Sequence, residues 1–336
     1  VIELFLTIGI INLLKNKMKL KNLVFIFLLS FCPIVIQSQI TNFKEKFELP
    51  NRVDETSGLL FLDGKIITHN DSGDNANLYE IDSLSGNLLR TISINNATNI
   101  DWEDITDDEN HIYIGDMGNN DGDRKNLKIY KVLKSDFKNN TSVSAKIISF
   151  SYEDQTNFSS SNDHNFDSEA IVVLDNSILI FTKNRGDFKT NVYKIPTTPG
   201  SHTAVKVSTA NVNGLITGAT LQDNNFLLCG YNFDKNAFLV FISFNRAPND
   251  DIFNNGFEKH ILKKELPNGS QVEGITSYDI GKFYISREKR SSLEQKLFEF
   301  TDFRFNLLSI NKNDSFDFKM NPNPAMNTFY INSKKN

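Results

Sequence analysis

The chain has 336 residues, of which 39% are hydrophobic and 23% charged, a composition that excludes disorder as its dominant state. Its 36 Lys and Arg against 41 Asp and Glu give a net charge of −5, which gives no electrostatic reason to expect a nucleic-acid partner. Twenty-eight Phe and nine Tyr lie among short aliphatic runs, which predicts an all-β protein.

The N-terminal region has the order of a secretory signal peptide. From Met18, two lysines are followed by an apolar run that Pro33 interrupts, and then by small and polar residues. This favours a cleaved signal peptide over a permanent membrane span. We expect residues 1–17 to be a mis-translated upstream extension, 18–38 to be the signal peptide, and the mature chain to be secreted or on the cell surface, without a transmembrane span. Of the two cysteines, Cys32 would be removed, which leaves Cys229 and excludes a disulfide framework or a Cys-rich zinc site.

Between residues 40 and 310 the chain contains a weak internal repeat. Each unit has a small or acidic start, a short apolar strand, a polar turn, and a second apolar strand that ends in a polar cluster. The equivalent points of the five units are Glu55, Glu103, Glu169, Gly218 and Glu273. The intervals between them are 48, 66, 49 and 55 residues, which are typical lengths of β-propeller blades.

A third strand follows in every unit and a fourth follows in the first four. The fifth unit lacks a fourth strand, whereas Phe43 to Leu49 alternates apolar and charged residues and has no partner. We predict that this N-terminal strand pairs with Gln295 to Phe300 and closes the ring. The expected fold is a β-propeller of five four-stranded blades, with six blades as the alternative. A polar insert, Glu153 to Asp167, accounts for the long second interval.

In a propeller the inner strands begin, and the second strands end, at the same mouth of the central channel. The strand starts bring acids to this mouth: Glu55, Asp101, Glu103, Asp104, Asp167, Glu169 and Glu273. The strand ends bring candidate ligand-binding residues: His69, Asn70, Asp71, Asp116, Asn119, Asn120, Lys183, Arg185, Tyr231 and Arg287.

Carboxylates that converge on a narrow mouth repel one another unless a positive charge is present. Ca²⁺ takes six to eight oxygen ligands, so one interpretation is a calcium site. Its candidate ligands are Glu55, Glu103, Glu169 and Glu273. In a second interpretation Lys183, Arg185 and Arg287 neutralise the acids directly, and in a third each acid accepts backbone N–H groups of the neighbouring blade. No Ser-His-Asp order, nucleophile elbow or Walker loop is present, so no catalytic residue is assigned.

Two segments resemble known families. Glu55 to Leu59 and Asp101 to Ile105, with Asp116, Asn119-Asn120 and Tyr130, resemble uncharacterised secreted propeller proteins of Bacteroidota with type IX sorting tails. Phe318 to Ile331, which contains Asn-Pro-Asn-Pro, resembles the opening of a type IX sorting domain, with Met320 and Asn321 where an aromatic is usual. The resemblance implies a truncated sorting domain at 318–336 and the type IX secretion machinery as a partner.

One acid per inner strand also looks, more distantly, like calcium-dependent propeller hydrolases of the phytase-like and gluconolactonase-like kinds. Three hypotheses follow. The first is a secreted propeller that binds a glycan, a peptide or a small molecule at the channel mouth, and this is the one we favour. The second is a calcium-dependent hydrolase of a phosphate ester or a lactone. The third is a structural surface module without a ligand.

Overall fold

The computed structural model describes residues 40–244, 251–290 and 292–305, and it confirms the predicted all-β class. The expected signal peptide and sorting segment lie outside these residues. In the part of the chain that is described, no helix has the length and apolarity needed to cross a membrane.

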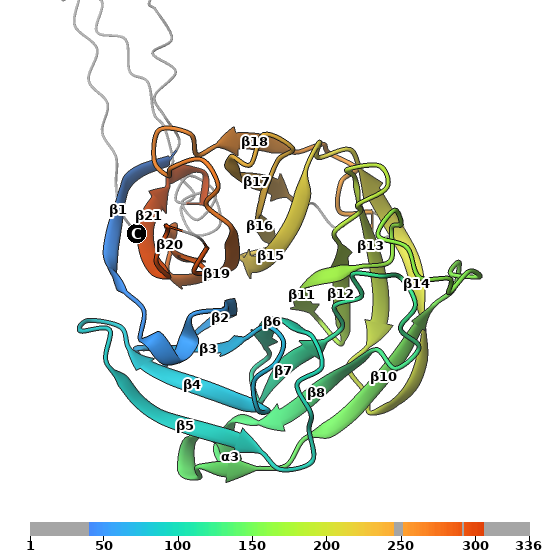
Figure 1. The fold of residues 1–336 in the computed structure, drawn as a ribbon, viewed down its shortest axis with the longest axis horizontal. Coiled ribbons are helices and arrows are strands. Elements are labelled where there is room, and N and C mark those ends of the chain that lie inside the picture. The colour runs from blue at the N-terminus through green and yellow to red at the C-terminus, as the bar shows by residue number, and fades with distance from the viewer. Residues whose placement is uncertain (1–39, 245–250, 291, 306–336) are drawn as a thin grey trace, which may run out of the picture. The chain divides into compact units, whose positions relative to one another are not determined.

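The strands form five consecutive groups around a common centre, each antiparallel and hydrogen-bonded in chain order (Figure 1). The first group contains β2 (Thr56–Leu62), β3 (Lys65–Asn70), β4 (Asn77–Asp82) and β5 (Leu88–Ile94), and the second contains β6 (Trp102–Asp107), β7 (His111–Asp116), β8 (Lys128–Leu133) and β10 (Lys146–Tyr152). The third contains β11 (Ser168–Leu174), β12 (Ser177–Thr182), β13 (Thr190–Pro196) and β14 (Gly200–Ala210), and the fourth contains β15 (Leu215–Gln222), β16 (Asn225–Tyr231), β17 (Ala237–Ser243) and β18 (Glu258–Ile261). The fifth contains β19 (Val272–Asp279), β20 (Lys282–Arg287) and β21 (Lys296–Asp302). Three short elements lie outside the groups: η1 (Asn51–Val53), α3 (Lys134–Asn139) and β9 (Ser142–Val143), which pairs with β5.

The fifth group obtains its fourth strand from the N-terminal side of the chain. Strand β1 (Ile40–Glu48) pairs antiparallel with β21, with Ile40 opposite Asp302 and Glu48 opposite Lys296. The Phe43 ring stacks on two rings of β21, those of Phe298 and Phe300, with centroids 5.7 Å from each. The predicted pairing of the N-terminal strand with the last strand is therefore confirmed.

The second and third groups are joined into one eight-stranded sheet. Strand β14 is long enough to serve both groups: its first half pairs in parallel with β10, from Ile148 opposite Gly200 to Tyr152 opposite Ala204. Its second half pairs antiparallel with β13. The insert 153–167 contains no strand and follows β10 directly, as the polar composition predicted.

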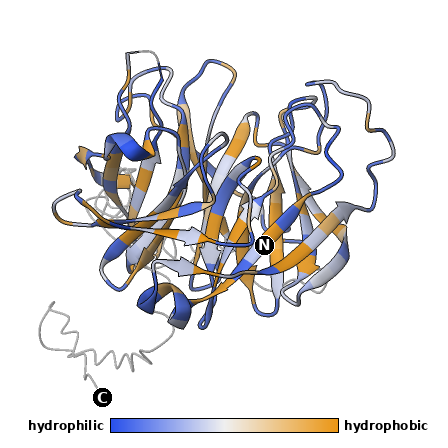
Figure 2. Ribbon diagram, turned by 60° about the horizontal axis from the view of Figure 1, so that its bottom comes forward, coloured by the Kyte–Doolittle hydropathy of each residue, from blue (hydrophilic) through white to orange (hydrophobic). Residues whose placement is uncertain are grey.

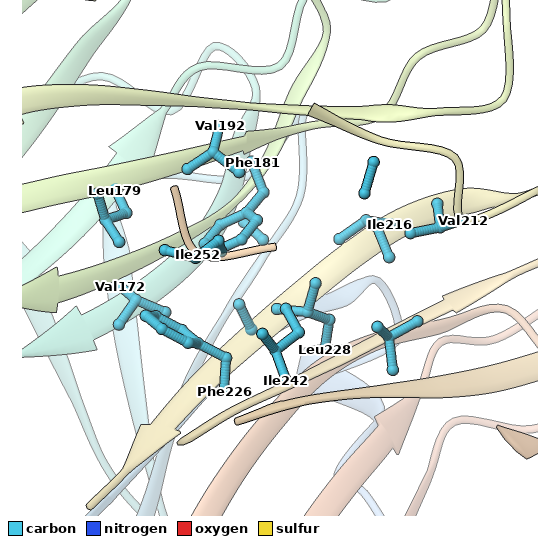
Figure 3. Close-up of a cluster of buried hydrophobic side chains, with 14 of the residues drawn as sticks. Val172, Leu179, Phe181, Val192, Val212, Ile216, Phe226, Leu228, Ile242 and Ile252 are labelled. Atoms are coloured by element: carbon cyan, nitrogen blue, oxygen red, sulfur yellow. The ribbon is translucent and has the colours of Figure 1, made fainter. Parts of the chain in front are cut away.

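The hydrophobic core is divided into clusters that lie between neighbouring groups. The inner strands β2, β6, β11, β15 and β19 contact one another in this cyclic order, and β19 contacts β2. Figure 3 shows the cluster between the third and fourth groups, where Phe181 and Phe226 meet with ring centroids 6.2 Å apart. Apolar residues are concentrated within the strands (Figure 2). Each fully buried large apolar side chain contributes about 1.5–3 kcal/mol to folding, so packing between groups holds the inner strands in place.

Candidate functional site

Every inner strand has a β-bulge near its start, and this bulge decides which side chain enters the channel. In each case the pairing with the second strand skips one residue. The skipped residues are Gly58, Glu103, Glu169, Thr217 and Glu273. A bulge of this kind redirects the extra residue away from the regular alternation of the strand. Three of the five equivalent positions are therefore glutamates.

The predicted equivalence of Glu55 and Gly218 with these glutamates is wrong. Glu55 precedes β2 and is exposed. Its backbone carbonyl accepts the backbone N–H of Asp71 at 3.0 Å. Gly58 holds the bulge position with φ +54°, and a Cβ there would lie 2.8 Å from the backbone nitrogen of Ile105. The first group thus has no room for an acid at the bulge, and Glu55 is removed from the candidate metal ligands.

Five acids form a cluster at the channel mouth, which we call the acid cluster: Asp71, Asp101, Glu103, Asp167 and Glu169. One carboxylate oxygen from each of Asp71, Asp101 and Glu103 lies within 4.8 Å of the other two, and the same holds for Glu103, Asp167 and Glu169. Glu103 belongs to both triads and is 3% exposed. The acid cluster therefore joins the first three groups through one shared carboxylate.

The loop after β7 is shaped to the acid cluster. The backbone N–H groups of Met117 and Gly118 both donate to the carbonyl of Asp101 at 3.1 Å. A Cβ atom at Gly118 would overlap Glu103 Oε1 and Asp101 Oδ2, so only glycine allows the loop to pass this close. The side-chain oxygen Asp71 Oδ1 is buried and has no hydrogen-bond partner among the described residues. The carboxylate oxygens of the acid cluster therefore lie close together with too few hydrogen-bond donors around them.

Lys183 is a buried cation of the site, and it neutralises an acid directly, as the second interpretation expected. Its Nζ donates to Glu169 Oε1 at 2.9 Å, its side chain is 6% exposed, and the Tyr231 ring lies 5.5 Å away. Burial lowers the pKa of Lys183, but Glu169, Tyr231 and Glu273 outweigh it and raise that pKa well above its ordinary value. Lys183 therefore stays charged and neutralises one of the acids around it.

Arg185 and two asparagines hold Asp167 in place. Arg185 Nε and the backbone N–H of Asn119 donate to opposite oxygens of the Asp167 carboxylate, at 2.9 and 2.7 Å. Asn120 is exposed; its side-chain oxygen accepts from Arg185, and its amide group lies 3.4 Å from Asp101 Oδ2. The insert covers this edge, since the carbonyl of His164 accepts the backbone N–H of Arg185 at 3.0 Å. Arg185 and Asn120 are thus the candidate residues at the outer edge of the mouth.

Burial and mutual repulsion raise the pKa values of the acids. Burial, followed by the charges of Asp101 and Glu169, raises the pKa of Asp71 to about 9. Burial raises the pKa of Glu169 to about 7, although Lys183 opposes the rise, and burial with Glu169 and Asp71 raises that of Glu103 well above its ordinary value. Oxygens of Asp71 and Asp101, and of Glu103 and Glu169, lie within 4.8 Å of each other. Burial and this proximity favour neutral carboxyl groups, so the cluster without a cation retains protons.

Several predicted ligand-binding residues have structural roles instead. His69 is fully buried against Trp102, with ring centroids 5.6 Å apart, and burial lowers its pKa to about 4. Asn70 donates to Asp74 Oδ2 at 2.8 Å, outside the acid cluster. Arg287 donates twice to the carbonyl of Glu294, at 3.1 and 2.8 Å, and its guanidinium lies 5.4 Å from the Phe298 ring.

Asp116 is also structural. It is fully buried, and Arg124 NH2 donates to its Oδ1 at 2.8 Å, while the same arginine donates to the carbonyl of Gly118 at 2.6 Å. This pair fixes the loop that presents Gly118 to the acid cluster. The remaining oxygen, Asp116 Oδ2, has no partner among the described residues.

Asp104 shows the predicted scaffolding role of an inner-strand acid. Its Oδ2 accepts the backbone N–H of Ile171 in β11 at 2.9 Å, and its Oδ1 accepts that of Ile105 at 2.8 Å. A further hydrogen bond comes from the backbone of Ala219 in β15. One carboxylate therefore links three inner strands, which separates Asp104 from the acid cluster in function.

Asp101 and Asp167 were named at the channel mouth but not as candidate ligands. Each lies two residues before a bulged glutamate, so an Asp-x-Glu pattern occurs at Asp101 and at Asp167. Both carbonyls cap the second strand, since Asp167 accepts the backbone N–H of Lys183 at 2.7 Å. The recurrence of this pattern in two neighbouring units is the signal that would have identified them.

No protein-family model and no curated protein matches the sequence. Among solved structures, exo-β-1,3-galactanase from Phanerochaete chrysosporium has 10% identity and a TM-score of 0.49, with 78% of this chain and 65% of that chain covered. A putative gluconolactonase has 10% identity and a TM-score of 0.41, with 74% of each chain covered. Hydrazine synthase from Kuenenia stuttgartiensis has 10% identity and a TM-score of 0.37; the match covers 72% of this chain and spans 58% of that one. Their activities are not transferred to this chain, because a site is not inherited with a distant fold.

Proposed function

We propose that the channel mouth binds a hard divalent cation of the calcium type, and through it a polar ligand from solvent. The observation that carries this proposal is the pair of acid triads that share Glu103, with ligand oxygens within 4.8 Å in each. The donor set fits the group, since all members are carboxylates and Asp71 Oδ1 lacks a partner. When bound, the cation would replace the shared protons and offer a positive docking point. Asp71, Asp101, Glu103, Asp167 and Glu169 would hold it.

We further infer that the chain is a five-bladed propeller that is secreted. Five inner strands in cyclic contact and the completion of the last group by β1 support five blades over six. The expected signal peptide at 18–38 and the sorting segment expected at 318–336, both sequence-based, support secretion by the type IX route, either into the medium or onto the cell surface. A glycan, a peptide or a small molecule remains the proposed ligand at the mouth.

A second candidate function is hydrolysis of a phosphate ester or a lactone. The observation in its favour is Glu169, whose pKa is raised to about 7 by burial beside the ammonium group of Lys183. A buried carboxyl group that titrates near neutral pH can act as a general acid or base. Release of p-nitrophenol from its phosphate, or opening of gluconolactone, by wild type and not by Glu169→Gln would favour hydrolysis over binding alone.

The test of cation binding is isothermal titration calorimetry with CaCl₂ on protein freed of divalent ions by a chelating resin. We expect saturable binding to wild type and a loss of at least about tenfold in affinity for Glu103→Gln, because both triads lose their shared ligand. Glu109→Gln is the matched control, since Glu109 is exposed and outside the acid cluster. Equal calcium binding by wild type and Glu103→Gln, or no binding by either, would contradict the proposal.

A further inference from the structure

A cavity of about 750 Å³ opens beside Tyr231, between the loops that follow β16 and β20 and the loop that precedes β19. We call it the side pocket and define it by Tyr231, Lys235, Ser270, Gln271 and Arg290. Two of its walls are tied together, because the backbone N–H of Gly269 donates to the carbonyl of Lys235 at 2.8 Å. A backbone hydrogen bond therefore holds two of the loops that form the side pocket in place.

The side pocket adjoins the acidic mouth through two of its lining residues. The Tyr231 ring lies 5.5 Å from Lys183 Nζ, and Lys183 is bonded to Glu169 of the acid cluster. Burial raises the pKa of Glu273, and Lys183 together with a side-chain hydrogen bond from Gln271 opposes the rise. Tyr231 and Gln271 thus line the side pocket and also neighbour residues of the mouth.

The lining of the side pocket has the opposite polarity to the acid cluster. No acid lines it among the described residues, whereas Lys235 and Arg290 do. Lys235 is exposed and has no ion pair with a described residue. Arg290 uses Nε for Glu288 Oε1, at 2.9 Å, and its terminal amino groups make no hydrogen bond to a described residue. Lys235 is therefore available to a ligand, and Arg290 offers its terminal amino groups while Nε stays bound to Glu288.

One buried donor in the side pocket has no partner. Ser270 is 1% exposed, lines the side pocket, and its Oγ has no hydrogen-bond partner among the described residues. A buried hydroxyl without a partner is costly, by about 1–3 kcal/mol, unless a ligand or water meets it. A hydroxyl donor and two cations that line one cavity are groups of the kind that recognise an oxyanion.

We propose that the side pocket is an oxyanion-binding subsite for a phosphate, sulfate or carboxylate group. This subsite extends the proposed function and rests on it in one respect. A ligand whose oxyanion group occupies the side pocket would bind the cation of the acid cluster through another of its polar groups. The substrate class is then an anionic small molecule or a glycan that carries charged groups. Binding of the oxyanion alone requires only Lys235, Arg290 and Ser270.

The test uses inorganic phosphate, with sulfate and acetate as parallel probes, titrated calorimetrically into the full chain after removal of divalent ions. We expect millimolar binding by wild type and at least about tenfold weaker binding by Lys235→Glu and by Arg290→Ala, because the first reverses and the second removes a positive charge in the side pocket. Ser270→Ala, which keeps every charge, is expected to weaken phosphate about threefold. Lys146→Glu, on the outer strand β10, is the matched control and should bind as wild type does.

The outcomes separate this inference from the proposed function. Binding of any of the three anions that falls in both charge variants and not in Lys146→Glu supports the side pocket, whether or not calcium binds. No anion binding, or the same loss in Lys146→Glu, overturns it. Calcium binding by wild type with no anion binding would leave the cation proposal standing and reject the side pocket alone. Thermal melting of each variant shows that the compared proteins are folded.

Discussion

Glu103 and Glu169, which are 66 residues apart in the chain, occupy the same bulge position on neighbouring inner strands and bring carboxylate oxygens within 4.8 Å of each other. At this separation both groups cannot be charged at low cost in a buried setting. The stability of the protein should therefore depend on what neutralises this pair, whether a proton or a cation.

Calcium should stabilise the protein against heat. A cation that binds only the folded state adds about 2.7 kcal/mol at a concentration of one hundred times Kd. We expect the melting temperature of wild type to rise with CaCl₂ and that of Glu103→Gln to rise clearly less at the same concentration. In calcium-free buffer Glu103→Gln should melt above wild type, because one of the repelling acids is gone. Differential scanning calorimetry checks both, and a calcium shift retained in full by Glu103→Gln would argue against the acid cluster as the site.

Stability without calcium should fall as the pH rises. The folded pKa of Glu169 is about 7 against an ordinary value of 4.5, so folding favours its protonated form. This contribution is fully present below pH 4.5 and is lost as the pH approaches 7. Urea unfolding of calcium-free protein should give a lower free energy of unfolding at pH 8 than at pH 5. Glu169→Gln should flatten the dependence; an unchanged slope would show that other groups cause it.

Removing the buried ammonium group should be costly at neutral pH. Lys183→Met leaves Glu169 and Glu273 without their cation, and loss of one partner of a buried pair costs about 3–5 kcal/mol. The control is Lys189→Met, whose ion pair with Asp187 is partly exposed and should contribute less than about 1 kcal/mol. Urea unfolding at pH 7.5 measures the difference, and part of the loss should be recovered at pH 5, where the acids take up protons. Equal effects of the two variants would remove Lys183 from this role.

Asp104 should affect stability without affecting calcium. Asp104→Ala removes the acceptor for the backbone N–H groups of Ile105 and Ile171 and leaves them unpaired, at about 1–3 kcal/mol for each group. We expect a large fall in melting temperature and an unchanged calcium affinity in the folded protein. Calorimetric titration below the new melting temperature is the measurement, and a parallel loss of calcium affinity would mean that Asp104 belongs to the cation site.

Loss of β1 should open the ring. A chain that begins at Leu49 leaves the outer edge of β21 unpaired and exposes Phe298 and Phe300, which β1 covers through Phe43. Exposed strand edges associate with one another, so we expect oligomers in light scattering and a lower melting temperature. As a control, Phe43→Leu keeps the strand and should remain in the same oligomeric state as wild type. A monomeric, equally stable chain without β1 would contradict closure by this strand.

The architecture was predictable from the sequence because it depends on patterns that survive divergence. Short apolar strands at regular intervals indicated the repeat, and the unpaired Phe43 to Leu49 indicated its closure. The exact alignment of the first and fourth units was not predictable, because the bulge shifts which residue enters the channel. Gly58 and Thr217 occupy the bulge positions that the predicted alignment gave to Glu55 and Gly218.

The chemistry of single residues was predicted less well for a different reason. Strand direction brings His69 and Arg287 to the mouth, as expected, but the side chains of a strand alternate between its two faces. His69 therefore packs against Trp102, and Arg287 binds the carbonyl of Glu294. Asp71, Lys183 and Arg185 were placed correctly in the neighbourhood of the acids, since each directly follows a second strand or lies close to its end.

The parallel pairing of β10 with β14 has a mechanical consequence for the mouth. These outer strands belong to the groups whose inner strands, β6 and β11, carry Glu103 and Glu169. Among the described residues no other two groups share a strand pairing, and β9, which lies outside the groups, pairs with β5 over only two residues. Backbone hydrogen bonds between the outer strands β10 and β14 therefore connect these two groups, while the other neighbouring groups are held together mainly by side-chain contacts. Thermal breathing would open the ring elsewhere first and leave the spacing of the two glutamates intact.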